Sequence, residues 1–355
     1  QLYCVNFDAT KDNNECKVQC LTEQGYTHSC NIDDTTFKYF ISLRSNLKTP
    51  NEFCVYSFDG KTSKELLSFE LPKKGKPTYF SYEPPKLVSI VNLDESKDST
   101  NISNDEIYLN TFSALIYTPD NFDANKGGYP TIIYVYGGPH VQLITNSWDR
   151  TTGNGRFQLW RKMGYVVALI DGRGSDGRGL QFEGRIKHNM GQIEIQDQVC
   201  LVEYLIKNGY TDKNKVALTG GSYGGYMSLL GLCQRPDIFK IVISIAPVVK
   251  WELYDTGYTE RYMGTPQKQQ NAYTKGSITY YAKGFPNEEN RLVIVHGLTD
   301  ENVHFFHTSS LLTALINLDK PYTLKVFPGE RHGIRQYKNI MYLEKYIIKH
   351  LNNYL

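Results

Sequence analysis

The 355-residue sequence predicts an α/β fold, a doubly wound and mostly parallel sheet, preceded by a shorter all-β segment. From Tyr108 onward, near-continuous apolar runs alternate with stretches of helical periodicity, which is typical of strands covered on both faces. Before about residue 70, short β-type segments are separated by turn-rich clusters. We therefore predict three parts: part of a β domain at 1–75, a linker at 76–107 and an α/β domain at 108–355.

The first part contains too few strands to close a β domain by itself. Its strands are expected at 1–7, 17–22, 36–43, 52–58 and 65–70. A propeller blade takes about 40 to 50 residues and a closed propeller has at least four blades, so we predict the C-terminal part of an incomplete β-propeller. The chain begins without Met and inside an expected strand, which predicts that it is part of a longer protein.

The α/β domain is predicted from a series of buried strands and amphipathic helices. The strands are expected at 131–136, 165–170, 215–219, 240–246, 292–296 and 322–327. A helix at 192–208 ends at Gly209, and a second amphipathic helix at 340–351 closes the chain. In such sheets the chemistry lies at the carboxyl ends of the strands, so functional residues are sought there.

The charge balance excludes several kinds of partner. The 39 basic and 37 acidic residues are interspersed, which gives no electrostatic basis for binding nucleic acid or an anionic membrane. No apolar run approaches the roughly 20 residues that a transmembrane helix needs, so no membrane segment is expected.

The seven cysteines predict neither a metal site nor a disulfide framework. Cys200 and Cys233 fall on expected helices and are predicted to be buried thiols. No C-x-x-C pair occurs among the others, so we predict no metal and a reducing compartment. These early cysteines are Cys4, Cys16, Cys20, Cys30 and Cys54.

The run Gly220-Gly221-Ser222-Tyr223-Gly224 matches the G-x-S-x-G pattern. A strand-like run precedes it and a stretch with helical spacing follows, so Ser222 is predicted to lie at a sharp turn between strand and helix. A Cβ at either flanking glycine would collide with neighbouring backbone. This context makes Ser222 a candidate nucleophile with an exposed, strained hydroxyl.

A serine nucleophile needs a base, and the base needs an orienting carboxylate. In the α/β-hydrolase arrangement these residues follow in the order Ser, Asp, His, each after a strand. Asp300 follows the strand expected at 292–296, and His332 follows the strand expected at 322–327. Ser222, Asp300 and His332 are therefore the candidate triad. Glu301 competes with Asp300, but the shorter side chain directly after Thr299 suits the position better.

Three other histidines lie near the candidate triad in the sequence. They are expected to be structural or, at most, to support the triad residues without belonging to the triad. They are His296, His304 and His307. His332 is preferred as the base because it lies in a glycine-flanked loop after the last strand.

Acyl transfer also needs hydrogen-bond donors for the oxyanion. The backbone N–H of Tyr223 is the expected first donor, because it follows the nucleophile. A second donor should come from Tyr136-Gly137-Gly138 after an earlier strand. The residues themselves leave open whether the Tyr136 phenol or a glycine amide supplies it.

Residues 246–264 follow a strand and are unusually aromatic. An aromatic group beside a serine nucleophile would form a compact apolar specificity pocket. A packed aromatic cluster without a ligand is the competing interpretation, and composition alone does not decide between the two.

Several of these segments resemble a known family. Residues 136–139, 222–225, 255–264 and 296–305 are similar to the dipeptidyl peptidase IV family of the prolyl oligopeptidase serine peptidases. Residues 191–195 and 330–332 resemble, more narrowly, the cytosolic dipeptidyl peptidases 8 and 9. The similarity is dense from about 129 to 335 and thinner from 1 to 70, where residues 25–30 resemble the end of the family's β-propeller.

The resemblance implies release of an Xaa-Pro or Xaa-Ala dipeptide from a free peptide N-terminus, through an acyl-enzyme on Ser222. Ser222, Asp300 and His332 match the family's triad, and Tyr136 matches its side-chain oxyanion donor. Asn302 matches the group that holds the penultimate carbonyl of the substrate, and Tyr223 matches one wall of the proline pocket. The other residues that match this pocket are Val248, Trp251, Tyr254, Tyr258 and Val303.

The sequence departs from the family pattern at two positions. Gly221 stands where the family usually has Trp, and Gly333 stands where the more similar members have Ser. The acidic residues that anchor the amino terminus of the substrate belong to propeller segments upstream of this chain, so the resemblance assigns none here. A free ammonium group needs a carboxylate partner to be recognised.

The resulting expectation is a serine exopeptidase without cofactor, cytoplasmic by resemblance and homodimeric, with the C-terminal helix as a contact. The alternatives are an oligopeptidase or acylaminoacyl-peptidase of the same clan, or a catalytically impaired fragment that acts as a binding module.

Overall fold

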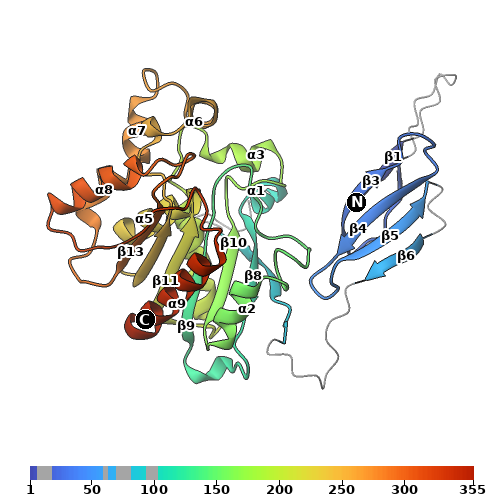
Figure 1. Cartoon of the computed structure of the whole chain (residues 1–355), viewed down its shortest axis with the longest axis horizontal. Coiled ribbons are helices and arrows are strands. Elements are labelled where there is room, and N and C mark those ends of the chain that lie inside the picture. The colour runs from blue at the N-terminus through green and yellow to red at the C-terminus, as the bar shows by residue number, and fades with distance from the viewer. Residues whose placement is uncertain (6–17, 59–62, 69–80, 93–102) are drawn as a thin grey trace. The chain divides into compact units, whose positions relative to one another are not determined.

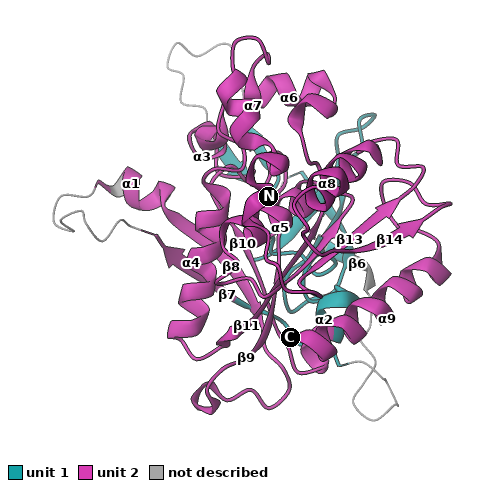
Figure 2. Cartoon of the chain, turned by 90° about the vertical axis from the view of Figure 1, so that its left-hand side faces the viewer, with its two compact units in different colours: residues 1–86, 145–159 teal, residues 87–144, 160–355 magenta. Residues whose placement is uncertain are grey.

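The structure is a computed structural model that describes residues 1–5, 18–58, 63–68, 81–92 and 103–355. These residues divide into two compact units (Figure 2). The first consists of residues 1–86 with 145–159, and the second of residues 87–144 with 160–355.

The first unit is antiparallel β structure. Its four-stranded sheet has the order β3 (Thr27–Ile32), β4 (Tyr39–Ser45), β5 (Glu52–Ser57) and β6 (Ser63–Ser68). A separate pair is formed by β1 (Tyr3–Val5) and β2 (Val18–Cys20). Leu21, Phe40, Cys54 and Tyr56 form the buried core of this unit. A four-stranded antiparallel meander is the repeating unit of a β-propeller, which agrees with the predicted propeller remnant.

Residues 145–159 also belong to the first unit. The Thr152 hydroxyl donates to the carbonyl oxygen of Leu47 at 2.6 Å, and the Trp148 amide donates to the hydroxyl of Ser45 at 3.2 Å. No pattern in the sequence indicated this return of the chain.

The second unit is built on an eight-stranded sheet in the order β14-β13-β12-β11-β9-β10-β8-β7. The pairings from β14 through to β10 are parallel, and β8 runs antiparallel to β10. The mostly parallel sheet agrees with the prediction. The strands are β7 (Lys86–Val91), β8 (Thr111–Tyr117), β9 (Tyr129–Tyr134), β10 (Val166–Asp171), β11 (Thr211–Gly221), β12 (Ile241–Ile245), β13 (Leu292–Gly297) and β14 (Thr323–Phe327).

Helices cover both faces of this sheet. α4 (Glu194–Lys207) and α5 (Tyr223–Gln234) pack against β11, whereas α9 (Tyr337–Tyr354) packs against β12. α4 and α9 lie on opposite sides of the strands (Figure 2). The other helices of the second unit are α1 (Asn104–Leu109), α3 (Leu180–Glu183), α6 (Thr256–Met263), α7 (Gln270–Gly276) and α8 (Phe306–Ile316), with 3₁₀ turns at Ala124–Lys126, Gly184–Ile186, Trp251–Leu253 and Ile278–Gly284. α2 (Gly155–Lys162) begins in the residues of the first unit and ends in those of the second.

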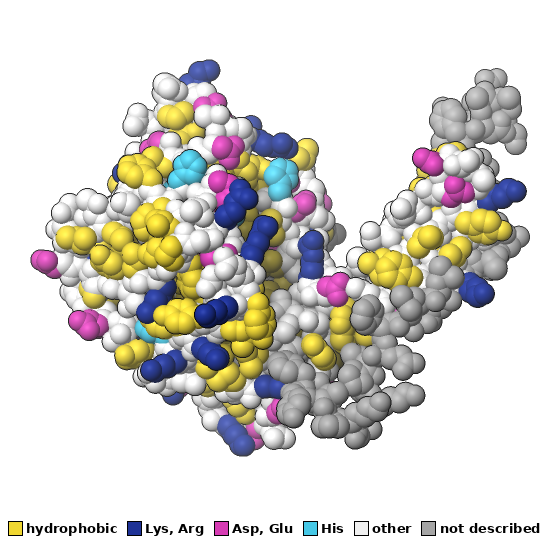
Figure 3. Space-filling model, viewed as in Figure 1, with side chains coloured by type: hydrophobic (Ala, Val, Ile, Leu, Met, Phe, Trp, Pro, Cys, Tyr) yellow, Lys and Arg dark blue, Asp and Glu magenta, His cyan; other side chains and the backbone are white. Residues whose placement is uncertain are grey.

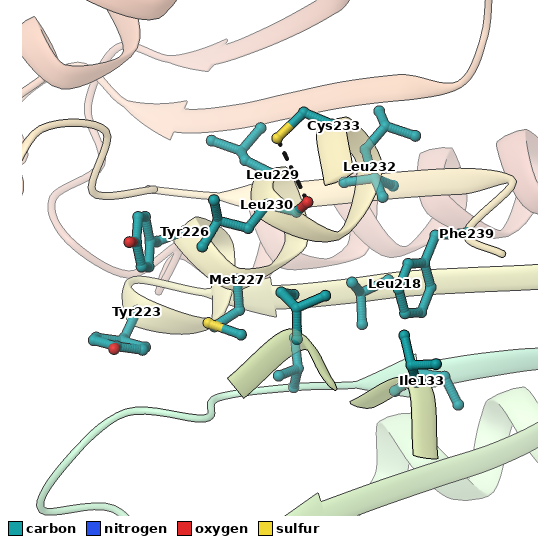
Figure 4. Packing of buried hydrophobic residues seen from close by; sticks show 14 of the residues in the cluster. Ile133, Leu218, Tyr223, Tyr226, Met227, Leu229, Leu230, Leu232, Cys233 and Phe239 are labelled. Carbon is teal, nitrogen blue, oxygen red and sulfur yellow. Dashed lines mark hydrogen bonds between the residues drawn. The ribbon is translucent and has the colours of Figure 1, made fainter. Parts of the chain in front are cut away.

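The core of the second unit includes α5 and the strands on which it lies. Leu229, Leu230 and Leu232 of this helix are fully buried, together with Leu218 and Ile133 from the strands (Figure 4). α5 is thus buried on all sides from Tyr223 to Cys233, and this burial holds the first turn of the helix in place.

The predicted linker at 76–107 was wrong in its second part. β7 is the strand at one end of the eight-stranded sheet, next to β8, and α1 lies inside the same range. The acidic, Ser- and Asn-rich composition of this region concealed the strand run Lys-Leu-Val-Ser-Ile-Val at residues 86–91. The strand predictions also omitted β3 and β8.

Candidate active site

Ser222 lies between the end of β11 and the start of α5, at the predicted turn. Its backbone has φ +58° and ψ −118°, which non-glycine residues rarely adopt. Its amide donates to the carbonyl of Ile245 at 2.9 Å, and its own carbonyl accepts from the Tyr226 amide at 3.0 Å. These two bonds hold the strained residue between neighbouring strand and helix.

The two flanking glycines are required by close backbone contact. A Cβ on Gly220 would lie 2.2 Å from the carbonyl oxygen of Val135, and one on Gly224 would lie 2.1 Å from the same atom. Gly221 is different, because a Cβ there would meet only the Ile245 oxygen at 3.8 Å. The departure from the family pattern at Gly221 is therefore not imposed by the backbone.

Asp300 and His332, which follow β13 and β14, contact each other directly. Asp300 Oδ2 lies 2.9 Å from His332 Nδ1. Asp300 Oδ1 accepts from the amides of Asn302 and Val303, each at 2.9 Å. Glu301, the competing acid, is instead exposed and pairs with Arg331 at 2.7 Å. Of the two candidate acids, only Asp300 orients the imidazole.

The surroundings of Asp300 favour its ionised form. Burial by itself would raise the pKa of this carboxyl, but hydrogen bonds from His296, His332 and the Asn302 amide hold its pKa well below the usual range. All of its partners act as donors, so the carboxylate remains negative next to His332.

His296, expected to be structural, is the second imidazole on Asp300. Its Nε2 lies 3.2 Å from Asp300 Oδ2 and 2.8 Å from the Val303 carbonyl oxygen, and both of these are acceptors. The proton therefore lies on Nε2, and Nδ1 accepts from the Thr308 hydroxyl at 2.8 Å. His296 is fully buried, and its hydrogen bond helps to hold the Asp300 carboxylate in place.

No hydrogen bond joins the hydroxyl of Ser222 to His332, two residues that the structure describes. The side chain of His332 is 27% exposed, so its outer nitrogen can reach solvent. In free enzymes such contacts are often long and tighten when substrate binds.

Tyr136 and Tyr223 stand beside the serine. The Tyr223 amide belongs to the first turn of α5, where amides have no partner within the helix. Burial and the neighbouring Tyr254 raise the pKa of Tyr136 to about 12, so its phenol keeps its proton at neutral pH. Tyr136 forms no hydrogen bond with any described residue, which leaves its hydroxyl available as a donor.

Five aromatic side chains pack together next to Ser222, and we call them the aromatic cluster. The Tyr223 ring lies 5.9 Å from that of Tyr136 and 5.5 Å from that of Trp251. Trp251 stacks on Tyr258 at 6.1 Å, and Tyr254 meets Tyr258 edge-on at 5.3 Å. The cluster thus consists of Tyr136, Tyr223, Trp251, Tyr254 and Tyr258.

The other residues predicted to bind substrate lie against or near this cluster. Val248 and Val303 are buried in the same core as Trp251. Asn302 is exposed, and its side-chain oxygen accepts from the Tyr254 hydroxyl at 2.9 Å. The loop that carries Asp300 and Asn302 therefore lies next to the aromatic cluster.

His307, also expected to be structural, holds the segment that carries Val248 and Trp251. Its Nδ1 accepts from the Val249 amide at 3.0 Å, and its Nε2 lies 3.2 Å from the Leu253 carbonyl. This pattern needs the neutral imidazole, with the proton on Nε2. Burial lowers the pKa of His307 to about 4, which is consistent with the neutral form.

Acid is expected to destabilise the fold through His307. Between pH 6.5, its ordinary value, and about 4, the unfolded chain binds a proton that the folded chain does not. Its contribution is complete above 6.5 and falls as the pH drops, by up to about 3 kcal/mol. Denaturant unfolding at pH 7 and 4.5 should show a larger loss for the wild type than for His307→Gln. Equal losses would contradict the assignment, and the exposed His304→Gln is the matched control.

The described part of the chain contains no group of three or more His, Cys, Asp or Glu side chains suited to a metal. Cys16, one of the early cysteines, lies outside the described residues. The six described cysteines are free thiols, and Cys233 is buried as predicted, whereas Cys200 is only partly buried.

The sequence did not indicate which contacts the buried polar residues around the site make. His296 and His307 were assigned no specific contact, and Glu194 was noticed only as part of a resembling segment. Glu194 is buried and accepts a hydrogen bond from the Tyr223 hydroxyl at 2.6 Å. An acidic residue near the start of the helix expected at 192–208 is the one sequence signal, but it does not identify the partner.

The sheet, the turn at Ser222 and the Asp300–His332 contact define an α/β-hydrolase. Residues 151–355 match the prolyl oligopeptidase family. The chain therefore belongs to the prolyl oligopeptidase family of serine peptidases.

Individual relatives agree with this assignment. Dipeptidyl peptidase 8 of Homo sapiens and of Mus musculus are each 40% identical to this chain, over 99% of its length. Prolyl endopeptidase FAP of Mus musculus is 31% identical over 84% of the chain. Among solved structures, a putative dipeptidyl aminopeptidase IV from Bacteroides ovatus superposes with a TM-score of 0.80 and 27% identity over 93% of this chain.

The chain spans 39% of the length of both dipeptidyl peptidases 8, 36% of the endopeptidase and 43% of the solved structure. None of the helices in the described residues combines the length and apolar character needed to cross a membrane.

Proposed function

We propose that this protein is a serine dipeptidyl peptidase that releases Xaa-Pro or Xaa-Ala dipeptides from free peptide N-termini. The observation that carries the proposal is the 2.9 Å contact between Asp300 and His332, on loops that follow β13 and β14 of the sheet whose strand β11 leads to Ser222. The dipeptidyl peptidase 8 relatives support the release of dipeptides. The preference for Pro or Ala rests on the family resemblance of the sequence.

In the proposed reaction Ser222 Oγ attacks the carbonyl carbon after the second residue of the peptide, and His332 Nε2 takes its proton. The oxyanion accepts hydrogen bonds from the Tyr223 amide and the Tyr136 hydroxyl. When the C–N bond breaks, His332 returns the proton to the leaving amine and an ester remains on Ser222. Water then attacks the ester with His332 as base, and the bond between the carbonyl carbon and Ser222 Oγ breaks. His332 returns the proton to Oγ, and the dipeptide leaves as a carboxylic acid.

The aromatic cluster, with Val248 and Val303, is the proposed wall of the pocket for the second residue. The pyrrolidine ring of proline is small, rigid and apolar, so aromatic faces suit it. Asn302 is the proposed donor to the carbonyl that precedes this residue. Because the amine-anchoring carboxylates are expected in segments upstream of this chain, no residue here is proposed for that role.

The function is tested with three probes of one preparation. Gly-Pro-p-nitroanilide should be cleaved, its N-acetylated form should resist, and a fluorophosphonate should label Ser222. Preference for the acetylated peptide would select an oligopeptidase or acylaminoacyl-peptidase instead. Failure of the fluorophosphonate to react would leave only a binding module.

Removing the hydroxyl of Tyr136 is expected to slow the chemistry more than it weakens binding. Tyr136→Phe keeps the ring in the aromatic cluster but loses one oxyanion donor, which is worth about 10²- to 10³-fold in kcat. Steady-state kinetics should show this loss with little change in KM. Tyr134→Phe is the control, because Tyr134 lies two residues earlier, at the last position of β9, and this variant should keep full activity.

We also propose a homodimer in which α9 takes part. Tyr337, Met341 and Tyr342 are exposed on this helix, and they share a hollow with Lys338 and Lys345. Hydrophobic side chains gather on this face in the space-filling view (Figure 3). Light scattering should give a dimer mass that Tyr342→Glu reduces to a monomer mass. The cytoplasmic location expected from the resemblance stays a prediction.

A further inference from the structure

A buried carboxylate lies at the phenol end of Tyr223. Glu194, the first residue of α4, is 2% exposed. Its Oε1 accepts from the Tyr223 hydroxyl at 2.6 Å and from the Gly191 amide at 2.8 Å, and its Oε2 accepts from the Ile193 amide at 3.1 Å. The three donors come from two segments that are distant in sequence.

The charge of Glu194 is not balanced by a cation. None of the ion pairs among the described residues includes this carboxylate. Burial raises the pKa of Glu194, and the hydrogen bonds from Tyr223 and the two amides oppose that effect. All three partners are donors, which matches the ionised carboxylate. A buried charge kept without a counter-ion is costly, so these hydrogen bonds are essential to it.

Tyr223 links this carboxylate to the reacting centre in two ways. Its amide is the proposed oxyanion donor, and its ring is a wall of the aromatic cluster. The ring also lies directly over Gly138, where an added Cβ would be 2.5 Å from Tyr223 Cγ. With one side against Gly138 and the hydroxyl bound to Glu194, the ring has one available orientation.

We propose that Glu194 is a positioning residue that sets the Pro-over-Ala selectivity of the site through Tyr223. This inference rests on the proposed function, because the pocket for the second residue is part of that proposal. Proline fills the space along the Tyr223 ring, whereas alanine leaves much of it empty. A ring released from Glu194 therefore penalises proline substrates more than alanine substrates.

The competing explanation is that Glu194 only caps α4. Its contacts with the Gly191 and Ile193 amides are typical of a carboxylate at a helix N-terminus. Such a residue would contribute to stability but would not influence selectivity. Tyr223 and Tyr226 start the same helix (Figure 4), which provides a matched pair for separating the two explanations.

Three variants test the positioning role of Glu194. Glu194→Gln places an amide NH₂ group against at least one of the three donors, and Tyr223→Phe removes only the hydroxyl. Tyr226→Phe is the control, because the Tyr226 hydroxyl is equally buried but donates to the carbonyls of Gly276 at 2.8 Å and Met190 at 3.3 Å. All three are expected to lower Tm.

The decisive measurement is kcat/KM for Gly-Pro- and Gly-Ala-p-nitroanilide. The ratio of the two should fall about 5- to 10-fold in Glu194→Gln and in Tyr223→Phe, which corresponds to loss of one buried hydrogen bond. The double variant should show no larger change, because both substitutions break the same contact. The ratio should stay unchanged in Tyr226→Phe. If the ratio in all the variants equals that of the wild type, the proposal is overturned. Glu194 would then only cap α4.

A second measurement keeps this inference separate from the proposed function. The rate of Ser222 labelling by a fluorophosphonate needs the triad and the oxyanion donors but no peptide recognition. If the wild type cleaves neither peptide, the proposed function fails. Slower labelling in Glu194→Gln and Tyr223→Phe than in Tyr226→Phe would then still support positioning by Glu194, and equal rates would overturn it.

Discussion

Replacing Ser222 by alanine is expected to lower turnover of Gly-Pro-p-nitroanilide by about 10⁶-fold. The alanine has no atom that can form the acyl bond, and neither Asp300 nor His332 can substitute for it. The residual rate should reflect only the oxyanion donors and substrate binding. Binding of the substrate should change little, since Ser222 contributes few ground-state contacts.

The measurement is single-turnover and steady-state hydrolysis with purified protein, together with Tm. Ser228→Ala is a suitable control, because Ser228 lies on α5, the helix that begins directly after Ser222, and its hydroxyl donates to the Gly224 carbonyl. That variant should keep most of the activity. Hydrolysis by Ser222→Ala at a rate near that of the wild type would rule out the nucleophile assignment.

Replacing Asp300 by asparagine is expected to lower kcat by about 10⁴-fold, the second largest effect. The carboxylate accepts four hydrogen bonds, from His296, His332 and the amides of Asn302 and Val303. An amide NH₂ group must face at least one of these donors. His332 then loses both its orientation and the negative charge that stabilises its protonated form.

Glu301→Gln is the matched control for the acid. Glu301 is adjacent in sequence and equally acidic, but it is exposed and pairs with Arg331. Its substitution should leave kcat within about twofold, as for most surface changes. The pH dependence of kcat in both variants completes the test. A larger loss in Glu301→Gln than in Asp300→Asn would reverse the assignment.

The fold and the order of the candidate triad could be predicted because both follow from local sequence patterns. Buried parallel strands lose the alternation of polar and apolar residues, and loops after them converge on one edge of the sheet. Ser222, Asp300 and His332 follow β11, β13 and β14 in this way. Their catalytic roles, and those of Tyr136 and Asn302, stay predictions until the variants are measured.

The supporting contacts could not be predicted, because they depend on how segments meet in three dimensions. His296 and His307 look alike in sequence, yet one holds the acid and the other holds the segment of Trp251. Glu194 lies 29 positions before its partner Tyr223. β7 was missed for a related reason, since its short apolar run adjoins an acidic stretch and is identified as a strand only by its pairing with β8.

The position of β14 at one end of the sheet affects the order in which activity and structure are lost on heating. β14 is the last strand at one end of the sheet, so it is held by one neighbouring strand, whereas β11 is held by two. Partial opening in native proteins begins where few contacts must break. His332 lies in the loop after β14, and the serine follows β11 in the interior of the sheet. Transient fraying of this edge would separate the imidazole from the hydroxyl while the rest of the molecule stays folded, so inactivation on heating would precede melting of the core.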